Sequence, residues 1–108
     1  MSVRRVLLPE AAAELLGAAE WYEARRPGLG VEFVGAIEAA MNAVESSPLA
    51  GAAWPESARH RRWRMDRFPF VLIYEIRTEG IEFVAFAHGR RMPGYWLSRV
   101  RTPSSPGT

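Results

Sequence analysis

Two β-prone segments in the second half of the chain, residues 70–77 and 81–88, are separated only by Thr78-Glu79-Gly80. A three-residue connection that contains glycine is typical of a β-hairpin. A third, shorter β-prone segment, residues 59–65, lies just upstream, so we expect an antiparallel meander of three strands. Both faces of residues 70–77 are apolar over most of their length. This pattern favours a central strand with helices covering only one face.

The first half of the chain has a helical pattern after a short apolar run, residues 3–8, that predicts a strand. Residues 10–26 and 31–47 each show apolar positions at helical spacing, and residues 27–30 break the pattern with Pro-Gly-Leu-Gly. Such a short break predicts an antiparallel helical hairpin. The positions expected to face the core are Ala12, Leu15, Leu16, Ala19 and Tyr22, then Phe33, Val34, Ile37, Ala40, Met41 and Val44.

The predicted order is therefore β-α-α-β-β-β, an α+β fold with the helical hairpin packed on a small, mainly antiparallel sheet. We expect one domain at residues 3–101, with residues 47–58 as a loop that includes at most a short helical turn. Residues 102–108, TPSSPGT, have no core-forming side chain and are predicted to be a disordered tail. No signal peptide and no membrane-spanning run is evident, and cysteine is absent, which favours a cytoplasmic protein.

Charge is distributed unevenly along the chain. Residues 1–54 carry 4 arginines and 7 glutamates, whereas residues 55–108 carry 10 arginines against 4 glutamates and 1 aspartate. Every basic residue is arginine, since lysine is absent. Arginine-rich codon usage of a GC-rich genome is one interpretation. The other is a basic surface for an anionic partner, either nucleic acid or an acidic protein segment.

Four arginines crowd the third β-prone segment: Arg59, Arg61, Arg62 and Arg64. On a strand, Arg59 and Arg61 point to one face while Arg62 and Arg64 point to the other, together with His60. A strand charged on both faces is expected at or near a sheet edge. There its charges either prevent edge-to-edge aggregation or bind an anion.

A second cluster follows the last predicted strand and consists of His88, Arg90, Arg91, Tyr95, Trp96 and Arg99. Structural roles are open for its members, namely a strand-end hydrogen bond for His88 and packing for Tyr95 and Trp96. No metal site is expected, because the two histidines have no metal-ligand spacing and cysteine is absent. Neither a Gly-x-Ser-x-Gly elbow nor a phosphate-binding glycine loop occurs, so no cofactor is expected.

Three segments together resemble the RelE/ParE superfamily of toxins, in particular its ParE-like branch. They are WYEARRPGLGVEFV, RWRMDRFPFVLIYEI and VAFAHGRRMPGYW, in this order. The resemblance extends over about residues 3–99. It implies the toxin of a bacterial type II toxin–antitoxin system, a class associated with plasmid stabilisation. It also implies a hetero-oligomeric complex with a cognate antitoxin whose extended C-terminal segment wraps the toxin.

The resemblance leaves two targets open. RelE-like toxins are endoribonucleases that cut mRNA in the ribosome, and in that case His88, Arg67, Arg90 and Tyr95 are the candidate catalytic residues. ParE-like toxins inhibit DNA gyrase without nuclease activity, and then Arg90, Arg91, Tyr95 and Arg99 form the expected contact surface. A basic binding module without toxicity is a third interpretation. Arginine stays protonated and is a poor general base, which favours the gyrase inhibitor.

Overall fold

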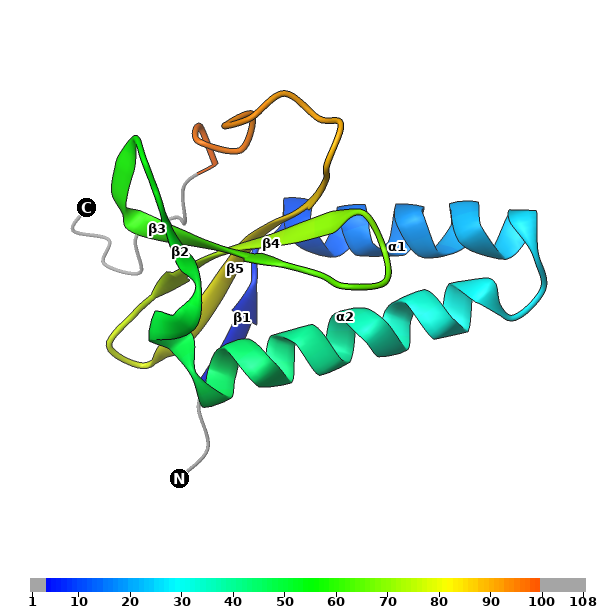
Figure 1. The fold of residues 1–108 in the computed structure, drawn as a ribbon, viewed down its shortest axis with the longest axis horizontal. Helices are drawn as coiled ribbons and strands as arrows, with labels where there is room; N and C mark the ends of the chain where they lie inside the picture. The colour runs from blue at the N-terminus through cyan, green and yellow to red at the C-terminus, as the bar shows by residue number, and fades with distance from the viewer. Residues whose placement is uncertain (1–3, 100–108) are drawn as a thin grey trace.

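The computed structural model describes residues 4–99, which form a helical hairpin on one face of a five-stranded sheet (Figure 1). The predicted α+β class is confirmed. The elements in chain order are β1 (Arg4–Leu7), α1 (Pro9–Arg25), α2 (Leu29–Ser46), the 3-10 turn η1 (Pro48–Ala50), β2 (Ala52–Trp54), β3 (Ser57–Arg64), β4 (Phe70–Ile76) and β5 (Gly80–His88). Val3, with which the first strand was expected to begin, and the predicted tail 102–108 lie outside the described residues.

The sheet has the strand order β1-β5-β4-β3-β2. β4 is central, as predicted, and the three C-terminal strands form the expected antiparallel meander. β1 is the exception in direction, because it pairs parallel to β5. Strand β2 was not predicted; it pairs with β3 inside the segment expected to be a loop, so β3 lies next to the edge and not on it.

The turn between the helices follows from its proline and glycine residues. α1 begins at Pro9. Proline has no backbone N–H, and the first turn of a helix offers that group no partner within the helix, so nothing is lost there. After α1, Gly28 adopts a left-handed conformation with φ of 90°, which other residues rarely adopt. The Glu23 carboxylate accepts hydrogen bonds from the backbone amides of Gly28 and Gly30. The hairpin is therefore fixed at its tip by one side chain of α1.

The core lies between α2 and the face of the sheet that carries Phe70, Leu72 and Tyr74. The α2 residues Phe33, Ile37, Met41 and Val44 are all buried against it. Leu16 and Val34 were expected in this core, but their exposed fractions are 63% and 40%. Each directly follows a residue that packs inward, Leu15 or Phe33, and one helical step turns a side chain by about 100° away from it. The inward-facing stripes are narrower than the sequence pattern indicated.

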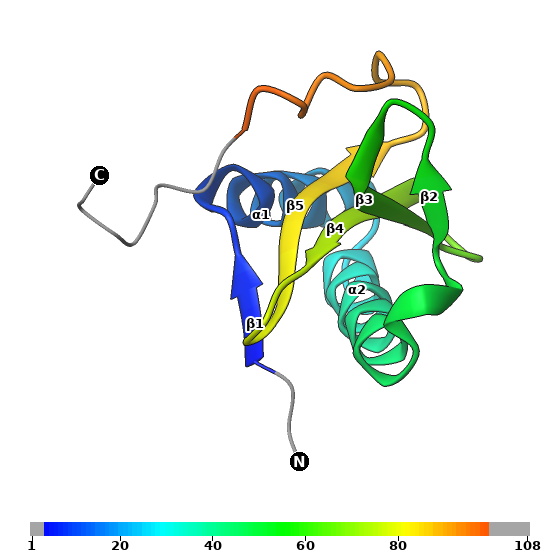
Figure 2. The same ribbon diagram turned by 90° about the vertical axis from the view of Figure 1, so that its left-hand side faces the viewer.

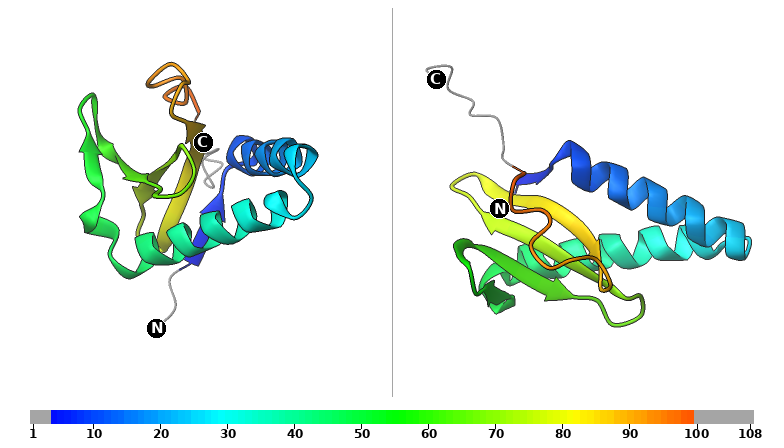
Figure 3. Two further views of the ribbon diagram at one scale, coloured as in Figure 1. Left: turned by 45° about the vertical axis from the view of Figure 1, so that its right-hand side comes forward. Right: turned by 90° about the horizontal axis from the view of Figure 1, so that it is seen from above.

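Beyond β5 the chain turns back across the other face of the sheet, opposite α2. Figures 2 and 3 show residues 89–99 on that side, while both helices lie on the first side. Trp96 anchors this segment, with its indole 4.9 Å from the Trp54 ring and 1% exposed. Packing of Trp96 onto the core, one of the open interpretations, is what the structure shows. Among residues 4–99, neither helix has the length and apolar character needed to cross a bilayer.

Candidate functional site

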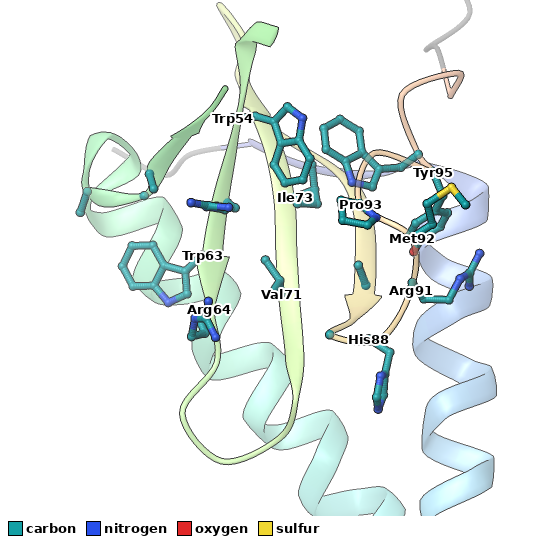
Figure 4. Close-up of a pocket in the computed structure, with 17 residues that line it drawn as sticks. Trp54, Trp63, Arg64, Val71, Ile73, His88, Arg91, Met92, Pro93 and Tyr95 are labelled. Atoms are coloured by element: carbon teal, nitrogen blue, oxygen red, sulfur yellow. The ribbon is translucent and has the colours of Figure 1, made fainter. Parts of the chain in front are cut away.

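The face of the sheet opposite the helices carries a groove of about 450 Å³ (Figure 4). Its floor is apolar and consists of Val71, Ile73 and Ala87, which point away from the helices because they alternate with core residues of β4 and β5. One wall comes from β2 and β3, and the other comes from the segment after β5. The wall side chains are Trp54, Arg62 and Arg64 on one side, and Arg91, Met92, Pro93, Tyr95 and Trp96 on the other.

The predicted anion-binding arginines are divided between the two faces of the sheet. Arg62 and Arg64 are exposed and line the groove, and the Arg62 guanidinium lies 5.7 Å from the centre of the Trp54 ring. Arg61 pairs across from Tyr74 on the helix side, where it donates a 2.8 Å hydrogen bond to the Gly51 carbonyl. Arg59 is exposed nearer the β2–β3 turn, outside the groove. Of these four arginines, only Arg62 and Arg64 therefore line the groove, where they face Arg91 of the opposite wall.

Residues 89–99, which we call the C-terminal segment, are fixed to α1 by Glu14. The Glu14 carboxylate accepts a 2.5 Å hydrogen bond from the Tyr95 hydroxyl and forms an ion pair with Arg99 at 2.8 Å. It also accepts the backbone amide of Phe86 at 3.0 Å. Burial, together with the hydrogen bond to Glu14, raises the pKa of Tyr95 to about 12. The Tyr95 phenol therefore stays protonated at neutral pH and acts as a donor.

The four residues expected to contact a target differ in how they are used. Arg90 and Arg91 are exposed, and the Arg91 guanidinium lies 3.8 Å from the centre of the Tyr95 ring. Tyr95 and Arg99 instead donate hydrogen bonds to Glu14. The hydrogen bond from Arg99 to Glu14 raises the pKa of Arg99 above its ordinary value. All four residues thus lie in one segment, but of the four only Arg90 and Arg91 are exposed to solvent.

Three of the four candidate catalytic residues are each held by a different partner. His88 lies on the face that carries Phe70, with ring centroids 5.2 Å apart, and its Nδ1 accepts the Arg90 amide at 3.0 Å. Arg67 pairs with Glu32 of α2 and lowers the pKa of that carboxyl. Tyr95 is held by Glu14. Figure 4 shows the His88 ring pointing away from the groove floor. The side-chain hydrogen bond of His88 is the strand-end role left open by the sequence.

Comparison with protein families matches residues 6–93 to the family described as ParE toxin of type II toxin-antitoxin system, parDE. The chain belongs to the ParE toxin family. Among solved structures, the one titled "Chromosomal ParDE TA system from P. aeruginosa" has a TM-score of 0.70 and 19% sequence identity. The match covers 81% of this chain and 96% of that chain, and it shows the same fold. Comparison with curated protein sequences gives no match.

Membership of the ParE toxin family confirms the resemblance to the RelE/ParE superfamily. It makes this chain a type II toxin by family. Within residues 4–99, no three histidine, cysteine, aspartate or glutamate side chains gather in a way that could hold a metal ion.

Sequence reasoning missed Glu14 and Trp54 as parts of this ParE family site. An acidic residue near the start of a helix is favourable by itself, so the sequence offers no reason to expect that Glu14 also binds Tyr95 and Arg99. Its neighbours give the signal, because Ala11 and Leu15 both pack against the core and place Glu14 on the edge of the buried stripe. Trp54 lies in a strand of only three residues, too short for a periodic pattern.

Proposed function

We propose that this ParE family member is the toxin of a type II toxin–antitoxin pair and that it inhibits DNA gyrase by binding it. We further propose that it acts in the cytoplasm and is neutralised by a cognate antitoxin. One observation carries the choice of target. The groups that RNA cleavage would require, His88, Arg67 and Tyr95, are each engaged by a different partner in the fold.

The chemistry of RNA cleavage explains why it matters that these three residues have different partners. Attack by a 2′-hydroxyl needs a proton acceptor, a proton donor and a cation close to one phosphate. Tyr95 cannot readily accept a proton at neutral pH, because its pKa is about 12 and its phenol is protonated. Its hydroxyl hydrogen already forms the hydrogen bond to Glu14. The Arg67 guanidinium is paired with Glu32. Inhibition through a contact surface needs no proton transfer, so the arrangement supports the gyrase inhibitor.

The exposed tip of the C-terminal segment is the proposed gyrase contact. Arg90 and Arg91 provide fixed positive charge, and the adjacent Met92 has an exposed fraction of 75%. Arginine and methionine are both enriched at protein interfaces. Tyr95 and Arg99 belong to the same surface as supports and not as contacts, since Glu14 holds both.

The groove is the proposed docking place of the antitoxin. Its apolar floor and the guanidinium groups of Arg62 and Arg64 are complementary to an acidic, amphipathic segment that folds on binding. The indole nitrogen of Trp54 is buried and has no acceptor among residues 4–99, so it can donate to a bound chain. Charge and shape thus support a partner segment with carboxylates beside apolar side chains.

The experiment compares two activities of the purified chain, inhibition of gyrase supercoiling and ribosome-dependent cleavage of mRNA. We expect inhibition of gyrase, a loss of about tenfold or more when Arg90 and Arg91 are both changed to alanine, and a change below about threefold for His88→Ala. In cells, induction should cause DNA-damage signalling and filamentation while translation continues. Ribosome-dependent mRNA cleavage that is lost in His88→Ala would overturn the proposal in favour of an endoribonuclease.

A further inference from the structure

The outer edge of β5 is only half covered by another strand. β1 pairs with the first four residues of β5, from Gly80 to Phe83, and the Leu8 amide adds one bond to the Phe83 carbonyl. The chain then turns away into α1. Beyond Phe83, no strand among residues 4–99 pairs with this edge. Backbone groups at such an edge need other partners, because leaving them unpaired in a partly buried place is costly.

Two side chains take the place of the missing strand. Glu14 Oε1 accepts the Phe86 amide at 3.0 Å, and Arg99 Nη1 donates to the Val84 carbonyl at 3.1 Å. Glu14 reaches this position because α1 lies beside β5 (Figure 3). The uncovered half of β5 is therefore closed by an ion pair between a residue of α1 and the end of the C-terminal segment.

The same ion pair positions the C-terminal segment. The side chains of Glu14 and Arg99 are only 15% and 14% exposed, so their hydrogen bonds are shielded from water and strengthened by charge. Tyr95 adds a third donor to this carboxylate. The Tyr95 ring in turn supports the Arg91 guanidinium at 3.8 Å. A chain of direct contacts thus leads from Glu14 through Tyr95 to Arg91.

The other end of the C-terminal segment is fixed independently. The Gly89 amide donates to the Pro69 carbonyl at 2.8 Å, directly after β5. Between this anchor and Tyr95, Arg90 and Arg91 are exposed to solvent. The tip is therefore held on one side by the backbone of the sheet, and on the other side by the Glu14 carboxylate beside the buried Trp96.

From this geometry we infer that Glu14 is a positioning residue for target binding. Its carboxylate holds Tyr95 and Arg99, and through them it sets the conformation in which Arg90 and Arg91 meet the target. Glu14 itself does not touch the target. The inference rests on the proposed gyrase contact, but the structural half of it is measurable without gyrase.

The test uses the full chain with Glu14→Gln, which keeps the size of the side chain and removes its charge. Glu20→Gln is the matched control, since Glu20 is an exposed glutamate of the same helix. Hydrogen exchange of the amides in residues 90–99 is measured beside that of β4 and β5, followed by inhibition of gyrase. In Glu14→Gln we expect exchange in residues 90–99 to rise about tenfold, exchange in β4 and β5 to change less than about twofold, and inhibition to weaken about tenfold. Glu20→Gln should match the wild type.

Tyr95→Phe is the second variant, which removes one donor and leaves the carboxylate paired with Arg99 in case Glu14→Gln fails to fold. It should give a smaller change of the same kind, with exchange in residues 90–99 and gyrase inhibition affected together. Unchanged exchange in residues 90–99 overturns the inference, as does a loosened segment that still inhibits gyrase at full strength. A wild type that does not inhibit gyrase refutes the proposed function instead. In that case the exchange result still decides whether Glu14 holds the segment.

Discussion

The imidazole of His60 packs against the indole of Trp96, with ring centroids 4.7 Å apart. Both residues are buried, at 6% and 1% exposure. The His60 Nδ1 atom lies 2.6 Å from the Ser57 hydroxyl, whereas Nε2 lies 4.0 Å from the Glu75 carboxylate. This contact links β3 to the C-terminal segment on the face opposite the helices. The segment therefore rests on a titratable group.

The first prediction is a loss of stability in mild acid. Burial lowers the pKa of His60 from its ordinary value of 6.5, an effect opposed by Glu75 and Glu82 and reinforced by Arg59 and Arg77. Between the lowered folded pKa and 6.5 the unfolded chain binds a proton that the folded chain does not, so stability falls as the pH decreases through this window. Urea unfolding at pH 7.5 and in steps below 6.5 measures how the free energy of unfolding depends on pH. His60→Gln should reduce this slope, and an equal slope in that variant would assign the effect to other groups.

The second prediction concerns the core. Phe70 is 7% exposed and contacts Phe33 of α2, with ring centroids 5.0 Å apart. Phe70→Ala should lower the free energy of unfolding by about 3–5 kcal/mol because it leaves a cavity between sheet and helix. Leu16→Ala is the control, because it also truncates a large apolar side chain but at an exposed position. It should change the free energy of unfolding by less than about 0.5 kcal/mol. Equal effects at the two sites would contradict the placement of α1 and β4.

The third prediction uses two glycines with opposite expected signs. A Cβ at Gly80 would lie 2.0 Å from the backbone oxygen of Arg4, so β1 would have to move away from β5. Gly80→Ala should therefore cost about 1–3 kcal/mol of stability. Gly17 lies within α1 with open space around it, and Gly17→Ala should stabilise the chain by about 0.5–1 kcal/mol. Thermal unfolding of both variants gives the comparison. A stable Gly80→Ala would show that β1 does not approach β5 as closely as described.

The fourth prediction tests the basic rim of the groove against the cognate antitoxin. Arg62→Glu and Arg64→Glu should each weaken antitoxin binding by about tenfold or more, because they turn attraction to an acidic segment into repulsion. Arg59→Glu is the matched control, since Arg59 is an exposed arginine of the same strand outside the groove. Calorimetric titration at two salt concentrations measures the effect, and the difference should shrink as salt rises. An antitoxin that binds all three variants equally well would place its docking surface elsewhere.

Sequence patterns predicted the long elements well because these elements bury regular stripes of side chains. The helices begin and end within about two residues of their predicted limits, since Pro9 and Gly28 mark the boundaries. β2 escaped prediction because three residues, Ala52–Trp54, cannot show an alternation. The parallel direction of β1 was also invisible, because strand pairing depends on the whole topology and not on the local pattern.

The candidate site was predicted less completely than the fold. The sequence placed Arg90, Arg91, Tyr95 and Arg99 in one cluster, and the structure does bring them into one segment. Their partner Glu14 lies 81 positions before Tyr95, so no local pattern could connect them. Side-chain pairing over such distances decides which charges are free to act and which are used to hold the chain together. That division is a property of three-dimensional structure.

The pairing of β1 with β5 has a consequence for how the chain folds as it is synthesised. The first strand and both helices leave the ribosome before any of β3, β4 and β5, because synthesis follows the order of the sequence. The inward side of α2, with Phe33 and Ile37, has no sheet to cover it until β4 has been made, and β1 must wait for β5. Contacts this distant in sequence slow folding and leave apolar surface open to chaperones and to neighbouring chains. The nascent helical hairpin is thus the stage at which this protein is most exposed to misassembly.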